Sequence, residues 1–142
     1  MVKVMTFGAF DVIHDGHRSL FRQAKEIGGK DSKLLVVVAS DARIMHFKGK
    51  KPWYSQKERM AHVQKEPLVD EVIPGDKVNS LKPILDNKPE IIVFGYDQPM
   101  KTAELMEQLV AQGFRPQKIV RAQAYKPHQF KSSKLKKKIR KN

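Results

Sequence analysis

The stretch from Leu34 to Ala39 restricts the fold more than any other part of the sequence. It begins with five consecutive large aliphatic residues and shows no polar alternation, which is typical of a parallel strand that is covered on both faces. Ile91 to Phe94 is a shorter apolar run that also predicts a strand. Parallel strands require crossover connections, which are usually helices. These runs therefore favour an α/β fold.

Strand and helix patterns alternate along the whole chain. Strands are expected at residues 2–7, 33–39, 71–73, 91–94 and 118–120. Helices are expected at residues 15–27, 41–45, 55–64, 78–85, 102–112 and 132–139. This order predicts one domain over residues 1–142, a doubly wound, Rossmann-like parallel sheet of about five strands with helices on both faces. Ligands of such sheets bind beyond the carboxyl ends of the strands.

The composition excludes several classes of protein. The chain has no cysteine, so disulfides and thiolate metal or redox centres are excluded. We find no secretory signal and no apolar stretch of membrane-spanning length, and we expect a cytoplasmic protein that does not enter a membrane. Hydrophobic residues make up 40% of the chain and charged residues 30%, which is typical of a globular protein.

The net charge of +13 is concentrated towards the C-terminus. No acidic residue follows Glu107, and eleven positive charges lie from Arg115 onward. We expect a basic C-terminal helix or tail from about residue 126. Such a segment attracts the phosphate groups of a small molecule or a nucleic acid, and a solvated run of charge explains it equally well.

The segment from Phe7 to His17 carries the chemistry, because it follows an expected strand and opens an expected helix. Gly8 lets the backbone turn tightly and approach a phosphate closely. The N-terminus of the following helix favours negative charge. His14 and His17 lie three residues apart around Gly16, so both imidazoles can point at one group. Two imidazoles there can donate hydrogen bonds to a phosphate as charge develops on it.

The two histidines have a second interpretation. An H-x-x-H pair can be half of a metal site, but no third ligand stands at a familiar spacing. We therefore expect no protein-built metal cage.

Residues 8–11 and 14–17 read G-A-F-D and H-D-G-H. With these motifs the chain resembles the cytidylyltransferase-like nucleotidyltransferases, whose pattern is G-T/S-F-D-x-x-H-x-G-H. It departs from that pattern at Ala9, which removes a hydroxyl near the phosphates. The resemblance implies that His14 and His17 bind the triphosphate and stabilise the transition state at its α-phosphorus. The acceptor's own phosphate would be the nucleophile, and Mg²⁺ would be held largely by phosphates and water.

Three further segments resemble the same family. Residues 48–52 and 55–59 resemble the loop that contacts phosphate groups, residues 95–98 (G-Y-D-Q) resemble a stretch of the archaeal-type FAD synthases, and residues 126–133 stand where many members carry R-T-E-G-I-S-T-[ST]. This last segment keeps the serines that can cap a helix but has lysine in place of the arginine. Lysine makes a point-charge contact where arginine would make a bidentate one.

The resemblance implies a set of functional residues. The catalytic residues are His14, His17 and Lys126. The nucleotide-binding residues are Phe7, Gly8, Ala9, Phe10, Asp11, Gly16, Gly95, Asp97, Ser132 and Ser133. The residues that bind the acceptor or its phosphate are Lys48, Lys51, Arg59 and Lys131. Candidate walls for an aromatic acceptor are Trp53, Tyr54, Tyr96 and Tyr125, although ordinary packing explains such residues equally well.

Three hypotheses follow from these observations. The leading one is transfer of AMP from ATP to FMN, giving FAD and pyrophosphate. The second keeps the chemistry and exchanges the substrates for CTP and glycerol 3-phosphate or another phosphorylated alcohol. The third is a nucleic-acid-binding protein on a degenerate fold, against which the intact histidine pair speaks. The sequence leaves the oligomeric state open, with a homodimer as one possibility.

Overall fold

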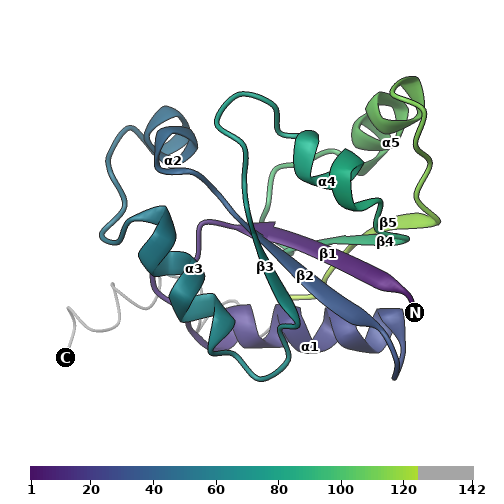
Figure 1. The fold of residues 1–142 in the computed structure, drawn as a ribbon, viewed down its shortest axis with the longest axis horizontal. Coiled ribbons are helices and arrows are strands. Elements are labelled where there is room, and N and C mark those ends of the chain that lie inside the picture. Colours follow the sequence, from purple (N-terminus) through teal and green to yellow (C-terminus); the bar gives the residue numbers. More distant parts are fainter. Residues whose placement is uncertain (125–142) are drawn as a thin grey trace.

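A computed structural model describes residues 1–124 of the chain (Figure 1). Its strands are β1 (Lys3–Gly8), β2 (Lys33–Val38), β3 (Glu71–Pro74), β4 (Ile91–Phe94) and β5 (Lys118–Arg121). Its helices are α1 (Asp15–Gly28), α2 (Asp41–Lys48), α3 (Gln56–Gln64), α4 (Lys82–Asn87) and α5 (Thr102–Ala111). The expected helix at residues 132–139 lies outside the described residues.

The five strands form one parallel sheet in the order β3-β2-β1-β4-β5. The chain adds β2 and β3 on one side of β1 and then crosses to the other side, where it adds β4 and β5. The strand order therefore reverses between β1 and β4. The structure confirms the predicted doubly wound parallel sheet. The reversal leaves a crevice at the carboxyl ends of β1 and β4, which is where such sheets bind ligands.

The sheet separates two hydrophobic core clusters. One cluster joins alternate residues of the central strands to α1 and α3, through side chains such as Phe21, Ala24 and Val63. The other joins the opposite faces of the strands to α4 and α5, through Ile84 and Leu109. Figure 1 shows these helix pairs on opposite faces of the sheet. The apolar run Leu34–Val38 of β2 is buried because its residues face both clusters.

Two helix boundaries lie three or more residues from the sequence-based expectation. Helix α4 begins at Lys82, four residues later than expected. The Asp76 carboxylate accepts the backbone N–H groups of Val78 and Asn79 at 2.9 and 2.7 Å, so these groups are used in a local turn. Helix α2 continues to Lys48 instead of ending near residue 45, and it stops at Gly49, which has a left-handed φ of 73°.

Within residues 1–124, none of the helices has the length and apolar character that crossing a bilayer requires. Helices α1, α3, α4 and α5 instead pack one face against the sheet. Helix α1, for example, buries Ser19, Leu20, Phe21 and Ala24. These helices therefore serve to cover the sheet.

The end of α1 packs unusually close to β1 at Gly28. A Cβ atom at this position would lie 2.3 Å from Cγ2 of Val4 and 2.7 Å from Cβ of Ser32. Val4 is fully buried in the central strand, so its stiff side chain cannot move aside easily. Packing, and not backbone conformation, therefore requires glycine at this position.

We predict that Gly28→Ala destabilises the protein. Helix propensity alone favours alanine by about 0.8–1 kcal/mol, whereas overpacking a filled core costs roughly 1–3 kcal/mol. The free energy of unfolding, measured by urea denaturation, should fall by about 1 kcal/mol or more. Glu26→Ala, at an exposed position of the same helix, is the control and should change it little. A more stable Gly28→Ala variant would show that the end of α1 is not tightly packed.

Candidate active site

A cavity of about 610 Å³ opens at the carboxyl ends of β1 and β4. Its walls come from the β1–α1 loop, the segment after α2, the loop after β4 and the residues that follow β5. A volume of this size is typical of small-molecule sites. The cavity therefore lies at the reversal of strand order, as the fold leads one to expect.

The structure brings together most of the residues that the sequence singled out. The cavity is lined by Phe7, Gly8, Ala9, Phe10, Asp11, His14, Gly16, His17, Lys48, Lys51, Gly95 and Asp97. Trp53 and Tyr96 also line it, whereas Tyr54 lines a smaller depression beside it. Five predicted residues lie outside the described part of the chain, namely Tyr125, Lys126, Lys131, Ser132 and Ser133.

His14 and His17 cap the start of α1 with their side chains. Nδ1 of His14 accepts the backbone N–H of Gly16 at 3.0 Å, and Nδ1 of His17 accepts the backbone N–H of His14 at 3.2 Å. The two rings stack with their centroids 4.0 Å apart. The helix start therefore fixes the position and orientation of both imidazoles.

These hydrogen bonds determine which ring nitrogen carries the proton. A nitrogen that accepts a hydrogen bond is unprotonated, so each neutral imidazole carries its proton on Nε2. Burial lowers the pKa of His14, against the opposing charges of Asp15 and Asp97. Burial, together with His14, Arg18 and Lys48, lowers the pKa of His17 to about 3. At neutral pH the pair thus offers two neutral Nε2–H donors beside the cavity.

The turn that leads to this pair is held in a strained conformation. Phe10 has a φ of +53°, which is uncommon for a residue other than glycine. Its buried ring packs edge-on against His17 with the centroids 5.1 Å apart. A Cβ atom on Gly8 would lie 2.7 Å from the Phe10 ring. Gly8 is therefore required because the Phe10 ring folds back beneath it.

Opposite charges line different parts of the cavity. Lys48 at the end of α2, with Lys50 and Lys51 just after it, is exposed to solvent, as are those two residues. Asp97 stands on the loop after β4. The lysines provide a cationic edge that suits phosphate groups.

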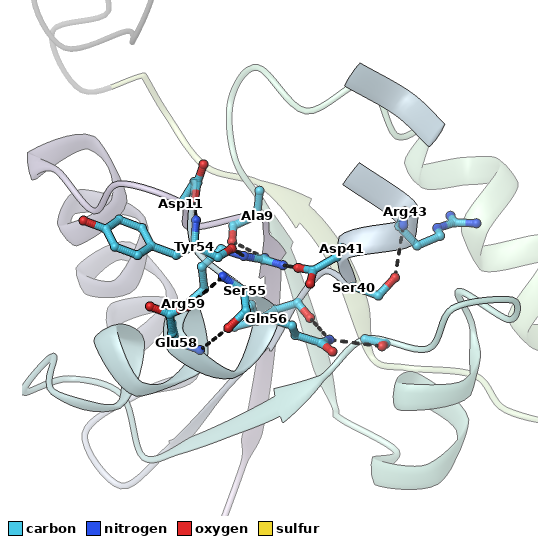
Figure 2. Close-up of polar contacts among 12 residues, drawn as sticks. Ala9, Asp11, Ser40, Asp41, Arg43, Tyr54, Ser55, Gln56, Glu58 and Arg59 are labelled. Carbon is cyan, nitrogen blue, oxygen red and sulfur yellow. Dashed lines mark hydrogen bonds and ion pairs between the residues drawn. The ribbon is translucent and has the colours of Figure 1, made fainter. Parts of the chain in front are cut away.

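Arg59 differs from the sequence-based expectation. Its side chain is fully buried and does not line the cavity. Its guanidinium group donates to the backbone carbonyls of Tyr54 and Ala9 and to the Asp41 carboxylate (Figure 2). The prediction that Arg59 contacts a substrate phosphate is therefore revised, because these protein acceptors occupy the guanidinium group.

Two contacts between distant segments of the site were not predicted from the sequence. Gln98 donates to the carbonyl of Phe7 at 2.9 Å and accepts the N–H of Gly95, which ties the end of β4 to the end of β1. Gln23 exchanges two hydrogen bonds with the backbone of Gln123, at 3.0 and 2.8 Å. The partners in the Gln98–Phe7 and Gln23–Gln123 contacts lie far apart in sequence, and no local pattern indicates them.

Tyr96 contributes a hydroxyl group that has no hydrogen-bond partner among residues 1–124. The oxygen atom is buried. Burial, with a contribution from Asp97, raises the pKa of this phenol. A buried polar group that lacks a partner is costly, and Tyr96 is one of the residues that line the cavity.

The fold and the histidine pair define a nucleotidyltransferase site, and comparison with known proteins agrees. The model of the cytidylyltransferase-like family matches residues 5–138. The chain belongs to this family.

Similar curated proteins carry a more specific name. A FAD synthase of Thermoplasma volcanium is 35% identical over 139 residues, which cover 98% of this chain and 94% of that protein. A FAD synthase of Methanothermus fervidus is 38% identical, over 96% of this chain and 93% of that protein. A solved structure from Thermoplasma volcanium, described as a lipopolysaccharide core biosynthesis protein, is 35% identical with a TM-score of 0.80, and the match covers 88% of this chain and 98% of that one.

The low pKa of His17 predicts a pH dependence of stability. Between pH 3 and 6.5 the His17 imidazole binds a proton in the unfolded chain but not in the folded protein. The free energy of unfolding therefore rises with pH across this range, and the contribution of His17 decreases as the pH falls from 6.5 towards 3. His17→Asn keeps a side-chain acceptor and removes this titration. We expect its stability to rise less steeply between pH 4 and 6, by up to about 1.4 kcal/mol per pH unit. Chemical denaturation at several pH values measures this, and parallel curves for the two proteins would contradict it.

Proposed function

We propose that the protein transfers AMP from ATP to FMN, giving FAD and pyrophosphate. The observation that carries the proposal is the pair of neutral Nε2–H donors that His14 and His17 hold beside the cavity. The names of the similar FAD synthases support the choice of substrates.

The proposed reaction needs no nucleophile from the protein. A phosphate oxygen of FMN attacks the α-phosphorus of ATP, the bond to the bridging oxygen of the β-phosphate breaks, and pyrophosphate leaves. Negative charge shifts towards the departing phosphates in the transition state. Fixed N–H donors stabilise this charge without reorganising, and His14 and His17 supply them together with the N-terminus of α1.

The other cavity residues divide between the two substrates. We assign the triphosphate to the β1–α1 loop with Gly8, and the acceptor phosphate to the edge formed by Lys48, Lys50 and Lys51. Trp53 supports a flavin acceptor because its side chain is 76% exposed at the rim of the cavity, where a planar ring could stack on it. The predicted roles of Lys126, Lys131, Ser132 and Ser133 stay predictions.

Mg²⁺ fits this site as an ion carried by the triphosphate. Among residues 1–124 no group of three or more histidine and carboxylate side chains could hold a metal ion. Of the two carboxylates at the cavity, Asp11 accepts two backbone N–H groups. Asp97 is the carboxylate that could hold Mg²⁺ together with substrate phosphates, since one or two carboxylates plus phosphates are a usual ligand set for this ion. When bound, the ion would neutralise charge on the phosphates. A cytoplasmic location and a homodimer stay predictions.

The substrates can be tested by pyrophosphate release. ATP and CTP are each combined with FMN, glycerol 3-phosphate or ethanolamine phosphate in the presence of Mg²⁺. We expect pyrophosphate release only in the combination of ATP with FMN, with FAD formed in an amount equal to the pyrophosphate. Release with CTP and a phosphorylated alcohol would keep the chemistry and contradict the flavin substrate. Silence in every combination, together with RNA affinity that falls steeply with salt, would favour the nucleic-acid-binding alternative.

The role of His17 can be tested by substitution. His17→Ala removes one Nε2–H donor, so kcat should fall by about 10²–10³-fold, as for loss of one oxyanion donor. Loss of the capping contact should cost only about 1 kcal/mol of stability. His46→Ala, an exposed histidine of α2 that does not line the cavity, is the matched control. Near-normal turnover of the His17→Ala variant would contradict the assigned role.

A further inference from the structure

Arg59 links two segments that contribute to the walls of the cavity, the β1–α1 loop and residues 53–54. Nη1 donates to the Ala9 carbonyl in the β1–α1 loop at 2.8 Å, and Nε donates to the Tyr54 carbonyl just before α3 at 3.0 Å. Nη2 donates to the Asp41 carboxylate at 2.6 Å. The side chain is fully buried, and Figure 2 shows it between these three partners. One guanidinium group thus joins the β1–α1 loop to the segment that follows the lysines.

Asp11 also connects the β1–α1 loop to residues 53–54, as a hydrogen-bond acceptor where Arg59 is a donor. Its two carboxylate oxygens accept the backbone N–H groups of Trp53 and Tyr54, at 2.7 and 3.0 Å. The carboxylate therefore already has two protein partners. Together, Arg59 and Asp11 cross-link residues 9–11 to residues 53–54 through four hydrogen bonds.

The carbonyl that Arg59 holds belongs to the strained turn. Ala9 precedes Phe10, whose φ of +53° persists only if its surroundings enforce it. The Phe10 ring in turn packs against His17. A hydrogen bond to Ala9 therefore helps to hold the turn on which one of the two phosphate donors rests.

Only arginine can make this set of contacts. Its rigid fork presents several N–H donors in one plane, whereas lysine offers a single charge on a flexible stem. Asp41 compensates the buried charge. The group is thus suited to fixing geometry, while its burial keeps it from the substrates.

We propose that Arg59 and Asp11 are positioning residues, which hold the β1–α1 loop and residues 53–54 in the arrangement that nucleotide binding and transfer require. The claim for transfer rests on the proposed function, whereas the claim for nucleotide binding does not need FMN. Neither residue has to touch a reacting atom. Their effect passes through Ala9, Phe10 and His17 on one side and through Trp53 on the other.

The test compares the variants Arg59→Lys and Asp11→Asn with the wild type. The first keeps the charge and loses the fork, and the second replaces one acceptor oxygen by an amide donor. The control is Leu109→Ala, which removes buried volume from the core cluster on the other face of the sheet and lowers stability without touching either loop. All proteins are assayed at a temperature at which circular dichroism shows them folded.

The first readout is the dissociation constant of α,β-methylene-ATP, a probe whose α–β bridge is not cleaved, measured by titration calorimetry. We expect both variants to bind it at least about tenfold more weakly and to lose kcat by up to about 10²-fold, as misplaced groups do. The Leu109→Ala variant should keep wild-type constants. Wild-type affinity and kcat in folded Arg59→Lys and Asp11→Asn, or an equal loss in Leu109→Ala, would overturn the proposal.

Other outcomes separate this inference from the proposed function. If Arg59→Lys does not fold, Asp11→Asn decides, because it changes a side chain that is not fully buried. A wild-type protein that binds α,β-methylene-ATP but does not form FAD contradicts the flavin substrate, and the comparison of affinities still decides the positioning role. A wild-type protein without affinity for the nucleotide would overturn both.

Discussion

The site depends on two hydrogen bonds in which imidazole nitrogens accept backbone N–H groups at the start of α1. Helices begin with N–H groups that have no partner within the helix, and here histidines satisfy them in place of the usual serine or aspartate. The choice has a chemical consequence, because an Nδ1 atom that accepts a hydrogen bond leaves the proton on Nε2. The same contacts that stabilise the helix thus prepare the phosphate donors.

The rest of the fold keeps this helix start in place. Core clusters on both faces of the sheet fix β1 and β4, so the ends of these strands form a rigid floor for the cavity. Gln98 ties the two strand ends together, and Arg59 with Asp11 ties the β1–α1 loop to residues 53–54. A site in which the donors are fixed in advance loses little entropy when charge develops.

The sequence was sufficient for the parts of this account that depend on local patterns. Apolar runs such as Leu34 to Val38 predicted buried parallel strands, and the histidine motif placed the site at the end of β1. It was not sufficient where contacts join distant segments. Arg59 was assigned to substrate because its segment resembles the family's phosphate-contacting loop, and only the fold shows that its acceptors are protein carbonyls and Asp41. The pairing of Gln23 with Gln123 had no signal for the same reason.

The central claim is that both histidines are neutral and carry their protons on Nε2 at neutral pH. Long-range ¹⁵N–¹H correlation spectra of the imidazoles at pH 7, assigned with the His14→Asn and His17→Asn variants, test it most directly. The account predicts an unprotonated Nδ1 and a protonated Nε2 in both rings. A charged imidazolium, or a proton on Nδ1 of either ring, would contradict the capping contacts and the mechanism built on them.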